Sequence, residues 1–297
     1  MAQQISNALV LGAIYILFTL GLSLAFGVVK ILNLAHGAIF MFSAFGGYII
    51  TREVVLPLAV VLPLTIVIGA ALAVTIDFLA FRAIRKRIPN ARQAELSMLI
   101  ASVGATSILV AIAREQLNNE TRNIPQKVFK VSVIRIGDII RITNLQLVIF
   151  VLGIIFTVAI GYLVQGTKTG RALRGLAYDP PTCALLGINA NVLTTVTMAI
   201  SGGLAGAAGV LLALNLNVVD AEMGDPFLLK AFAIIILGGA GSVPGAVLGG
   251  FVLAFAETMT AAYLSTSYRD AIAFGLILVI LLLRPEGLLA RKGFERA

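Results

Sequence analysis

Tryptophan is absent from this chain of 297 residues, cysteine and histidine occur once each, and charged residues make up only 12% of it. One cysteine cannot form an intrachain disulfide, and one cysteine with one histidine cannot complete a zinc site. We therefore expect neither a metal nor a cofactor. Soluble proteins carry about a quarter charged residues, so the scarcity of charge argues against an ordinary soluble domain.

Hydrophobic residues make up 59% of the chain, and its mean hydropathy is +1.02. A membrane-spanning helix needs about 20 apolar residues to cross about 30 Å of hydrocarbon. The sequence therefore predicts an all-α, polytopic integral membrane protein with about eight or nine membrane segments, some short or broken, in a single transmembrane domain over residues 1–297. The apolar segments are residues 5–29, 38–51, 55–81, 94–113, 144–164, 193–214, 228–239, 244–263 and 269–284.

The basic residues predict an orientation in the membrane. RAIRKRIPNAR, residues 82–92, carries five basic residues and no acidic one, and QGTKTGRALRG, residues 165–175, carries three basic residues. Cytoplasmic loops hold an excess of Lys and Arg, so we expect both stretches in the cytoplasm, the N-terminus outside and the C-terminus cytoplasmic. The net charge of +8 is thus a topology signal, and no nucleic-acid partner is expected.

The loop at residues 115–143 works against this rule, because it is basic and is predicted on the periplasmic side. Its second half alternates apolar and polar residues and turns at Gly137-Asp138, which predicts a small hairpin. A solvated loop explains this segment, and contact with an outer partner is the alternative.

Two stretches interrupt the apolar segments. One is NLAHG, Asn33 to Gly37, which contains the only histidine, His36; the other is GGAGSVPG, Gly238 to Gly245, which is rich in glycine and contains a proline. Unpaired backbone groups cost several kcal/mol each in lipid, so both breaks should face protein or a water-filled pathway. His36 either holds its break together by hydrogen bonds or contacts the transported solute.

The stretch GLAYDPPTCALLGINANV, residues 175–192, predicts a short helix. Asp179 suits the N-cap, Pro180 the first helical position, and Gly187 the left-handed residue that closes the end. So short a helix cannot span a bilayer, so we place it at the inner surface within a cytoplasmic loop at residues 165–192. Its apolar face either docks a partner or lies passively in the membrane interface.

No lysine directly follows a glycine, so the GxxxxGK[ST] nucleotide-binding motif is absent. If ATP drives this protein, the ATPase is a separate subunit that docks on a feature such as residues 179–189.

Taken together, these pieces resemble the membrane permease subunits of bacterial branched-chain amino-acid ABC transporters, in particular the first of the two paralogous permeases. The matching motifs, in chain order, are GVVKILNLAHG, GRALRGLAYDPPTCALLGIN, SGGLAGAAGVLLAL, KAFAIIILGGAGSVPGAVLGG, AETMTAAYLSTSYRD and RPEGLL. The resemblance implies a multi-pass protein of the bacterial inner membrane that is not itself an enzyme. It further implies a paralogous second permease, two cytoplasmic ABC ATPase subunits and a periplasmic binding protein that delivers Leu, Ile or Val.

The resemblance also implies roles for individual positions. Residues implied in ATPase coupling are Asp179, Ala184, Leu186, Gly187, Ile188 and Asn189. Residues implied at the helix breaks or the translocation path are Asn33, His36, Gly37, Gly238, Gly239, Gly241, Ser242, Pro244, Gly245 and Glu257. This sequence departs from the family pattern at Ala38 and Tyr178, where relatives often carry an acidic residue.

Other functions stay open at this point. Relatives with these motifs carry urea, amides or other amino acids. A secondary transporter or channel would need a carboxylate near the middle of the membrane, for which Glu257 is the strong candidate. An intramembrane hydrolase would need a nucleophile within reach of a base, and His36 is the only imidazole.

Overall fold

The computed structural model describes residues 1–30, 32–54, 56–124, 129, 131–136, 140–239 and 241–283. Most of the described residues lie in helices, and two short strands between α5 and α6 form a hairpin. The elements are α1 (Ala2–Val29), α2 (Ala35–Glu53), α3 (Leu58–Ile76), the π-helix η1 (Asp77–Phe81), α4 (Arg82–Arg87), α5 (Ala91–Leu117), β1 (Val133–Ile136), β2 (Ile140–Thr143), α6 (Asn144–Gly166), α7 (Lys168–Tyr178), α8 (Pro180–Leu185), α9 (Ala190–Leu216), α10 (Gly224–Gly238), α11 (Val243–Tyr263), the 3-10 helix η2 (Thr266–Tyr268) and α12 (Arg269–Leu283).

Each predicted apolar segment coincides with a helix, but the helices differ in reach. Among the described residues, six helices are long and apolar enough to cross a membrane, and they include α1, the continuous helix from α3 to α4, α5, α6, α9 and α11. By contrast α10 has 15 residues, which is short of the roughly 20 that a full span requires. The chain is thus polytopic and contains a short membrane segment, as predicted.

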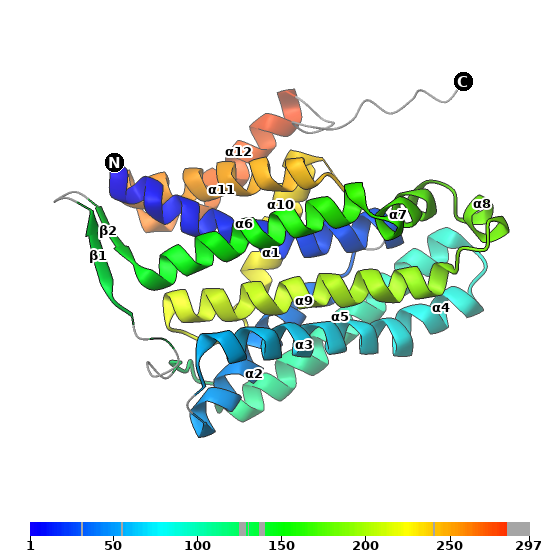
Figure 1. The fold of residues 1–297 in the computed structure, drawn as a ribbon, viewed down its shortest axis with the longest axis horizontal. Helices are drawn as coiled ribbons and strands as arrows, with labels where there is room; N and C mark the ends of the chain where they lie inside the picture. Colours follow the sequence, from blue (N-terminus) through cyan, green and yellow to red (C-terminus); the bar gives the residue numbers. More distant parts are fainter. Residues whose placement is uncertain are drawn as a thin grey trace.

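The bundle has two distinct ends (Figure 1). The N-terminus and the β1–β2 hairpin lie at one end, here called the hairpin end, whereas α4, α7 and α8 lie at the other, here called the α8 end. The basic stretches 82–92 and 165–175 therefore share one end, as the predicted topology requires. Which end faces the cytoplasm stays a prediction.

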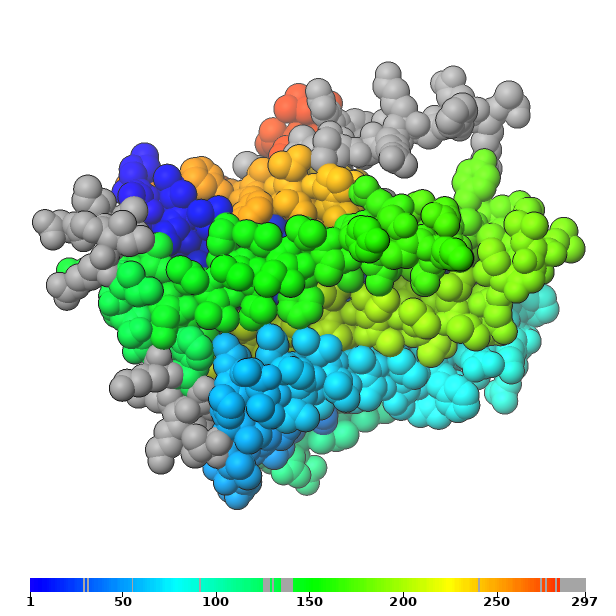
Figure 2. Space-filling view, viewed as in Figure 1, coloured from blue at the N-terminus to red at the C-terminus, as the bar shows by residue number. Residues whose placement is uncertain are grey.

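Helices α1 and α9 form the centre of the bundle. Within their most apolar windows, 78% of α1 and 83% of α9 is buried inside the protein, against 22% for α5 and 17% for α6. Figure 2 shows α6 and α3 forming much of one outer face. Since lipid is as apolar as a leucine side chain, α5 and α6 can present apolar residues to the membrane while α1 and α9 are enclosed by protein.

Close glycine contacts hold α9 against its neighbours. A Cβ atom on Gly202 would collide with the backbone of Gly69 in α3, and one on Gly209 would collide with the backbone carbonyl of Phe40 in α2. Glycine at these positions lets the helix backbones touch, which is how membrane helices associate without a hydrophobic drive. As a result, α2, α3 and α9 pack as one unit.

Local capping rules explain where several helices begin and end. Thr143 and Gln146 form a capping box at the start of α6, with Gln146 N donating to Thr143 Oγ1 at 3.1 Å. Asn90 caps α5, and α9 ends at Asn217 in the left-handed conformation. The strands pair antiparallel with Val133 opposite Thr143, as their alternation predicts, while the predicted turn at Gly137-Asp138 lies outside the described residues.

Two helical stretches lie where the sequence analysis described only basic loops. The helix that begins as α3 continues through η1 to the end of α4, and α7 is an amphipathic helix that buries Leu173 and Leu176. Arg174 also donates a hydrogen bond to the carbonyl of Val164 in α6. Much of both basic stretches is thus packed helix rather than solvated loop.

Candidate functional site

The first predicted break exists, but it begins earlier in the chain than predicted. Helix α1 ends at Lys30 in the left-handed conformation, and α2 begins at Ala35, so His36 and Gly37 lie inside the first turn of α2. Asn33 makes this start possible because its side-chain oxygen accepts from Ala35 N at 3.1 Å. The asparagine thus satisfies the amide of the first residue of α2, which limits the number of unpaired backbone groups.

His36 is enclosed in the centre of the bundle, with no exposed surface. Its Nε2 lies 3.0 Å from the carbonyl of Phe18 in α1, and its Nδ1 lies 3.4 Å from Ser201 Oγ in α9. Both contacts fit one neutral tautomer, in which Nε2 donates to the carbonyl and the serine donates to Nδ1. The ring thus joins the start of α2 to the middle of both central helices.

Two further contacts place this break deep in the protein. Leu34 N donates to Ser102 Oγ at 3.2 Å, and Ser102 lies in the middle of α5. Gly37 faces the first residue of α10, Gly224, so closely that a side chain on either would meet the other's backbone. The Nδ2 of Asn33 is buried without a hydrogen-bond partner. Protein therefore covers the part of the break next to α2, whereas Lys30 and Leu32 at its start are exposed.

The second break is narrower than the predicted range. Helix α10 ends at Gly238 and α11 begins at Val243, so Pro244 and Gly245 belong to the first turn of α11. Gly238 and Gly245 are in backbone contact. Gly239 and Gly241 have φ angles of 91° and 77°, a region that favours glycine. Ser242 Oγ accepts from Gly245 N at 3.1 Å and so caps α11.

The short helix at residues 179–187 forms as predicted. Asp179 Oδ1 accepts from Thr182 N at 3.2 Å, and α8 then runs over Pro180–Leu185. Gly187 has a φ of 78°, and the amide of Ile188 donates to the carbonyl of Cys183 at 3.0 Å, which closes the helix in a Schellman-type end. Hydrogen bonds from Thr182 lower the pKa of the Asp179 carboxyl, so the cap is ionised at neutral pH.

The outer face of this segment is apolar and open. The side chains of Leu185 and Leu186 are 89% and 74% exposed, and that of Tyr178 is 90% exposed. Cys183 faces inward against Gly175. Asn189 accepts from Asn191 N at 3.0 Å and begins α9, so the segment leads directly into a central helix.

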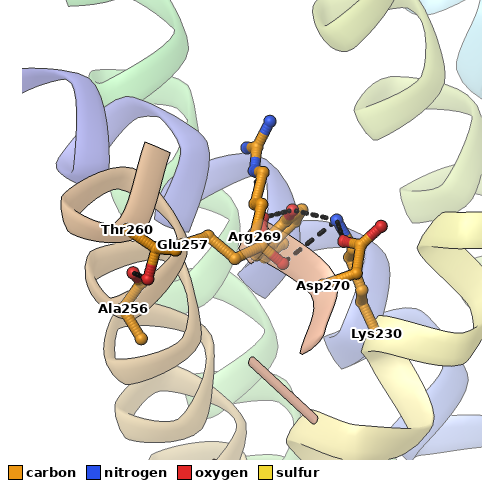
Figure 3. A network of polar contacts seen from close by, with 7 residues as sticks. Lys230, Ala256, Glu257, Thr260, Arg269 and Asp270 are labelled. Carbon is orange, nitrogen blue, oxygen red and sulfur yellow. Dashed lines mark hydrogen bonds and ion pairs between the residues drawn. The ribbon is translucent and has the colours of Figure 1, made fainter. Parts of the chain in front are cut away.

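The structure also brings together a cluster of charged and polar side chains around the buried Glu257. This charged cluster consists of Tyr15, Lys230, Glu257, Arg269 and Asp270. Glu257 is fully buried and lies on α11; it accepts from Tyr15 Oη at 2.7 Å and from Arg269 Nε at 2.9 Å. Lys230 Nζ sits 3.0 Å from Glu257 Oε1 and 3.0 Å from Asp270 Oδ1, between the two carboxylates (Figure 3). Opposite charges thus compensate one another within the membrane segments.

Glu257 was predicted from the sequence, whereas its partners Tyr15, Lys230 and Arg269 were not. Lys230 lies in the apolar segment 228–239, and a lone charge in such a segment is the signal that could have revealed it. No local rule connects Lys230 to Tyr15, which is 215 residues away in sequence and accepts from its amino group at 3.3 Å.

A second buried acid, Asp77, connects two helices at the α8 end of the bundle. Arg85 Nη2 donates to its Oδ1 at 2.7 Å, and Thr195 Oγ1 in α9 donates to its Oδ2 at 3.0 Å. Asp77 begins the π-helix η1, a conformation that often marks a functional position. The contact ties the continuation of α3 to the first turns of α9.

A cavity of about 470 Å³ lies beside this end. It opens between α1, α6, α7 and the glycine turn before α11, and its lining includes Ser23, Arg174, Tyr178 and Gly241. Helix α7, which directly precedes the short helix α8, and the second break therefore border the same space.

A polytopic bundle with interrupted membrane helices is the architecture of a membrane transporter. Residues 4–281 match the family described as "Branched-chain amino acid transport system / permease component". The chain therefore belongs to the branched-chain amino-acid ABC transporter permease family. It is a multi-pass membrane protein and a permease component rather than an enzyme, and such permeases work with ATPase and binding-protein partners.

Relatives support this assignment along the whole chain. The chain is 30% identical to the "High-affinity branched-chain amino acid transport system permease protein LivH" of Escherichia coli K12, and the match covers 99% of this chain and 97% of that protein. It is also 30% identical to the permease protein BraD of Pseudomonas aeruginosa, with the same coverage. A 27% identity to the ribose import permease protein RbsC of Haemophilus influenzae covers 48% of this chain and 46% of that protein.

A solved structure shows the same fold at low sequence similarity. The structure of PsaBC from Streptococcus pneumoniae in complex with Fab matches with a TM-score of 0.51 and 14% identity, over 94% of this chain and 91% of that chain. The likeness concerns the fold alone.

Proposed function

We propose that this chain is the permease subunit of an ABC importer that carries branched-chain amino acids, Leu, Ile or Val, across the bacterial inner membrane. It works beside a paralogous second permease, with two cytoplasmic ATPase subunits and a periplasmic binding protein. Residues 1–297 form one permease domain, in which the loop at 115–143 is periplasmic and the loop at 165–192 docks the ATPase.

The full-length similarity to LivH and BraD carries the proposal, because both are named for branched-chain amino acids and both are covered nearly end to end. The similarity to a ribose permease covers only about half of the chain. An amino acid is therefore favoured over a sugar as the solute.

The geometry of the α8 end supports the docking role. Residues 179–189 form a rigid, capped segment with exposed Leu185 and Leu186, and Asn189 begins α9. Helix α9 is bonded through Thr195 to Asp77 and touches α3 at Gly202. A displacement of the docked segment would thus move α9 and α3 together. Coupling requires an element with two discrete arrangements, and the packed pair of α3 and α9 is that element.

The test is Gly187→Trp in the complete transporter, reconstituted with its ATPases and binding protein. The added indole has room, since nothing lies within 4 Å of the Cβ position, but it stands on the face that would meet the ATPase. We expect normal membrane insertion and retained ATP hydrolysis, with amino-acid uptake reduced about tenfold or more, because the left-handed φ and the indole both disturb docking. Uptake of radiolabelled leucine per ATP hydrolysed measures this.

Gly187→Asn is the matched control, because asparagine tolerates the left-handed region and adds little bulk. It should keep uptake near the wild-type rate. Unchanged uptake in Gly187→Trp would remove the docking role, and uphill accumulation without any ATPase would instead indicate a secondary transporter.

A further inference from the structure

We propose that the Lys230–Asp270 edge of the charged cluster is a binding site for the charged ends of a free α-amino acid. Lys230 binds the carboxylate, and Asp270 binds the ammonium group. The inference rests on the proposed function, since it concerns the solute of that same transporter, and it names the residues that recognise the zwitterion.

The cluster has a buried half and an open half. Glu257 has no exposed surface, and the exposed fraction of the Arg269 side chain is 37% and that of Asp270 is 62%. Glu257 keeps Tyr15 and Arg269 as hydrogen-bond partners, so it does not depend on Asp270. The Lys230–Asp270 contact is therefore the one pair in the cluster that can open from outside without disturbing the interior.

Charge balance favours a zwitterion over an ion. The cluster holds two cations, Lys230 and Arg269, and two anions, Glu257 and Asp270. A solute with a single charge would pair with one of Lys230 and Asp270 and leave the other without this opposite charge, which is unfavourable in a membrane segment. An α-amino acid carries both charges on groups attached to the same carbon atom by bonds of about 1.5 Å, so it replaces one ion pair by two and leaves the net charge unchanged.

The amino group of Lys230 is held ready for this exchange. It has three N–H donors, and it lies near Glu257 Oε1, Tyr15 Oη and Asp270 Oδ1. When the solute carboxylate replaces Asp270, the other two partners keep the amino group in place. The approach to Glu257 Oε1 is an ion pair without hydrogen-bond alignment, so this oxygen also lacks an aligned donor.

Apolar surface adjoins the charges. Lys230 Nζ lies 6.0 Å from the centre of the Phe227 ring, which is only partly buried. Leu264 and Tyr268, which lie five residues and one residue before Arg269 in the chain, are 68% and 59% exposed. These groups offer a branched aliphatic side chain an apolar contact next to the charged pair.

The location suits solute entry. Glu257 lies six residues before the end of α11, about 9 Å along the helix axis. That end of α11 and the start of α12 are joined by residues 264–268, a loop that the predicted topology places outside. A solute released by the binding protein would thus meet this site early in its passage.

The test is direct binding of radiolabelled leucine to the purified complete transporter in nanodiscs, without binding protein. Three unlabelled compounds are compared as competitors of the radiolabelled leucine: leucine itself, 4-methylpentanoate, which lacks the ammonium group, and 3-methylbutylamine, which lacks the carboxylate. In the wild type, leucine should displace the label at about tenfold lower concentration than either analogue, because each lost charged hydrogen bond has that effect.

In Asp270→Asn, leucine and 4-methylpentanoate should displace the label at similar concentrations, because the ammonium group has lost its partner, and Asp270→Glu should restore the preference. Asp225→Asn, an exposed acid on α10 outside the cluster, is the matched control and should behave as the wild type. A wild-type preference in Asp270→Asn would overturn this site alone. Failure of the wild-type transporter to bind leucine in this assay would overturn this site alone, whereas failure to import leucine with its ATPases and binding protein would overturn the proposed solute and this site with it.

Discussion

The chain buries two polar centres in its membrane segments, and they are stabilised in different ways. Around His36, neutral groups satisfy one another, and the ring has no exposed surface. Around Glu257, full charges compensate one another, and one side of the cluster is open through Asp270. Neutral hydrogen bonds can close a helix break completely, whereas charges in a membrane are expensive and mark functional positions. We therefore propose a structural role for the first centre and solute binding for the second.

The largest expected effect comes from Glu257→Gln. The change leaves Lys230 and Arg269 facing a neutral amide, and an uncompensated buried charge costs about 3–5 kcal/mol. The melting temperature of the purified protein in detergent should fall sharply. The double variant Glu257→Gln with Arg269→Gln should recover part of the loss because it removes one unpaired cation. An unchanged melting temperature in the single variant would show that the cluster does not stabilise the fold.

An intermediate effect is expected from His36→Leu. The substitution leaves Ser201 Oγ without its partner and removes the bond to the Phe18 carbonyl, a loss of about 1–3 kcal/mol. Leucine uptake, normalised to the amount of folded transporter, should stay at the wild-type level. Reduced uptake by molecules that are fully folded would instead place His36 on the solute path.

The smallest effect is expected from Ser201→Ala. Its contact with His36 Nδ1 is long, at 3.4 Å, so its loss should cost at most about 1 kcal/mol. The melting temperature should therefore fall less than in His36→Leu. A fall as large as in that variant would mean that the serine, rather than the Phe18 carbonyl, fixes the imidazole ring.

The sequence predicts best where neighbouring residues decide the structure. The cap at Asp179, the left-handed Gly187 and the short helix between them follow from residues a few positions apart, and all three are present. Both breaks exist near the predicted positions, but His36 and Pro244 belong to the first turns of the following helices, since α2 begins at Ala35 and α11 at Val243. The side-chain oxygens of Asn33 and Ser242 accept from amides in those first turns.

The sequence predicts least where the structure depends on contacts between residues far apart in the chain. Tyr15 and Glu257 are 242 positions apart, and nothing local to either indicates the other. The amphipathic α7 was hidden because its basic residues resemble a topology signal, while Leu173 and Leu176 show their helical spacing only against a packing surface. Without an arrangement of helices in space, these contacts could not be inferred.

The single thiol of the chain is a ready-made reporter. Cys183 is shielded beneath the exposed leucines of α8, and its sulfur would lie 3.1 Å from a Cβ atom on Gly175. No engineered cysteine is needed to follow this helix, since the single thiol of the unmodified protein lies in α8. The rate at which Cys183 is alkylated, measured by mass spectrometry with and without ATP, would show whether α8 moves away from α7.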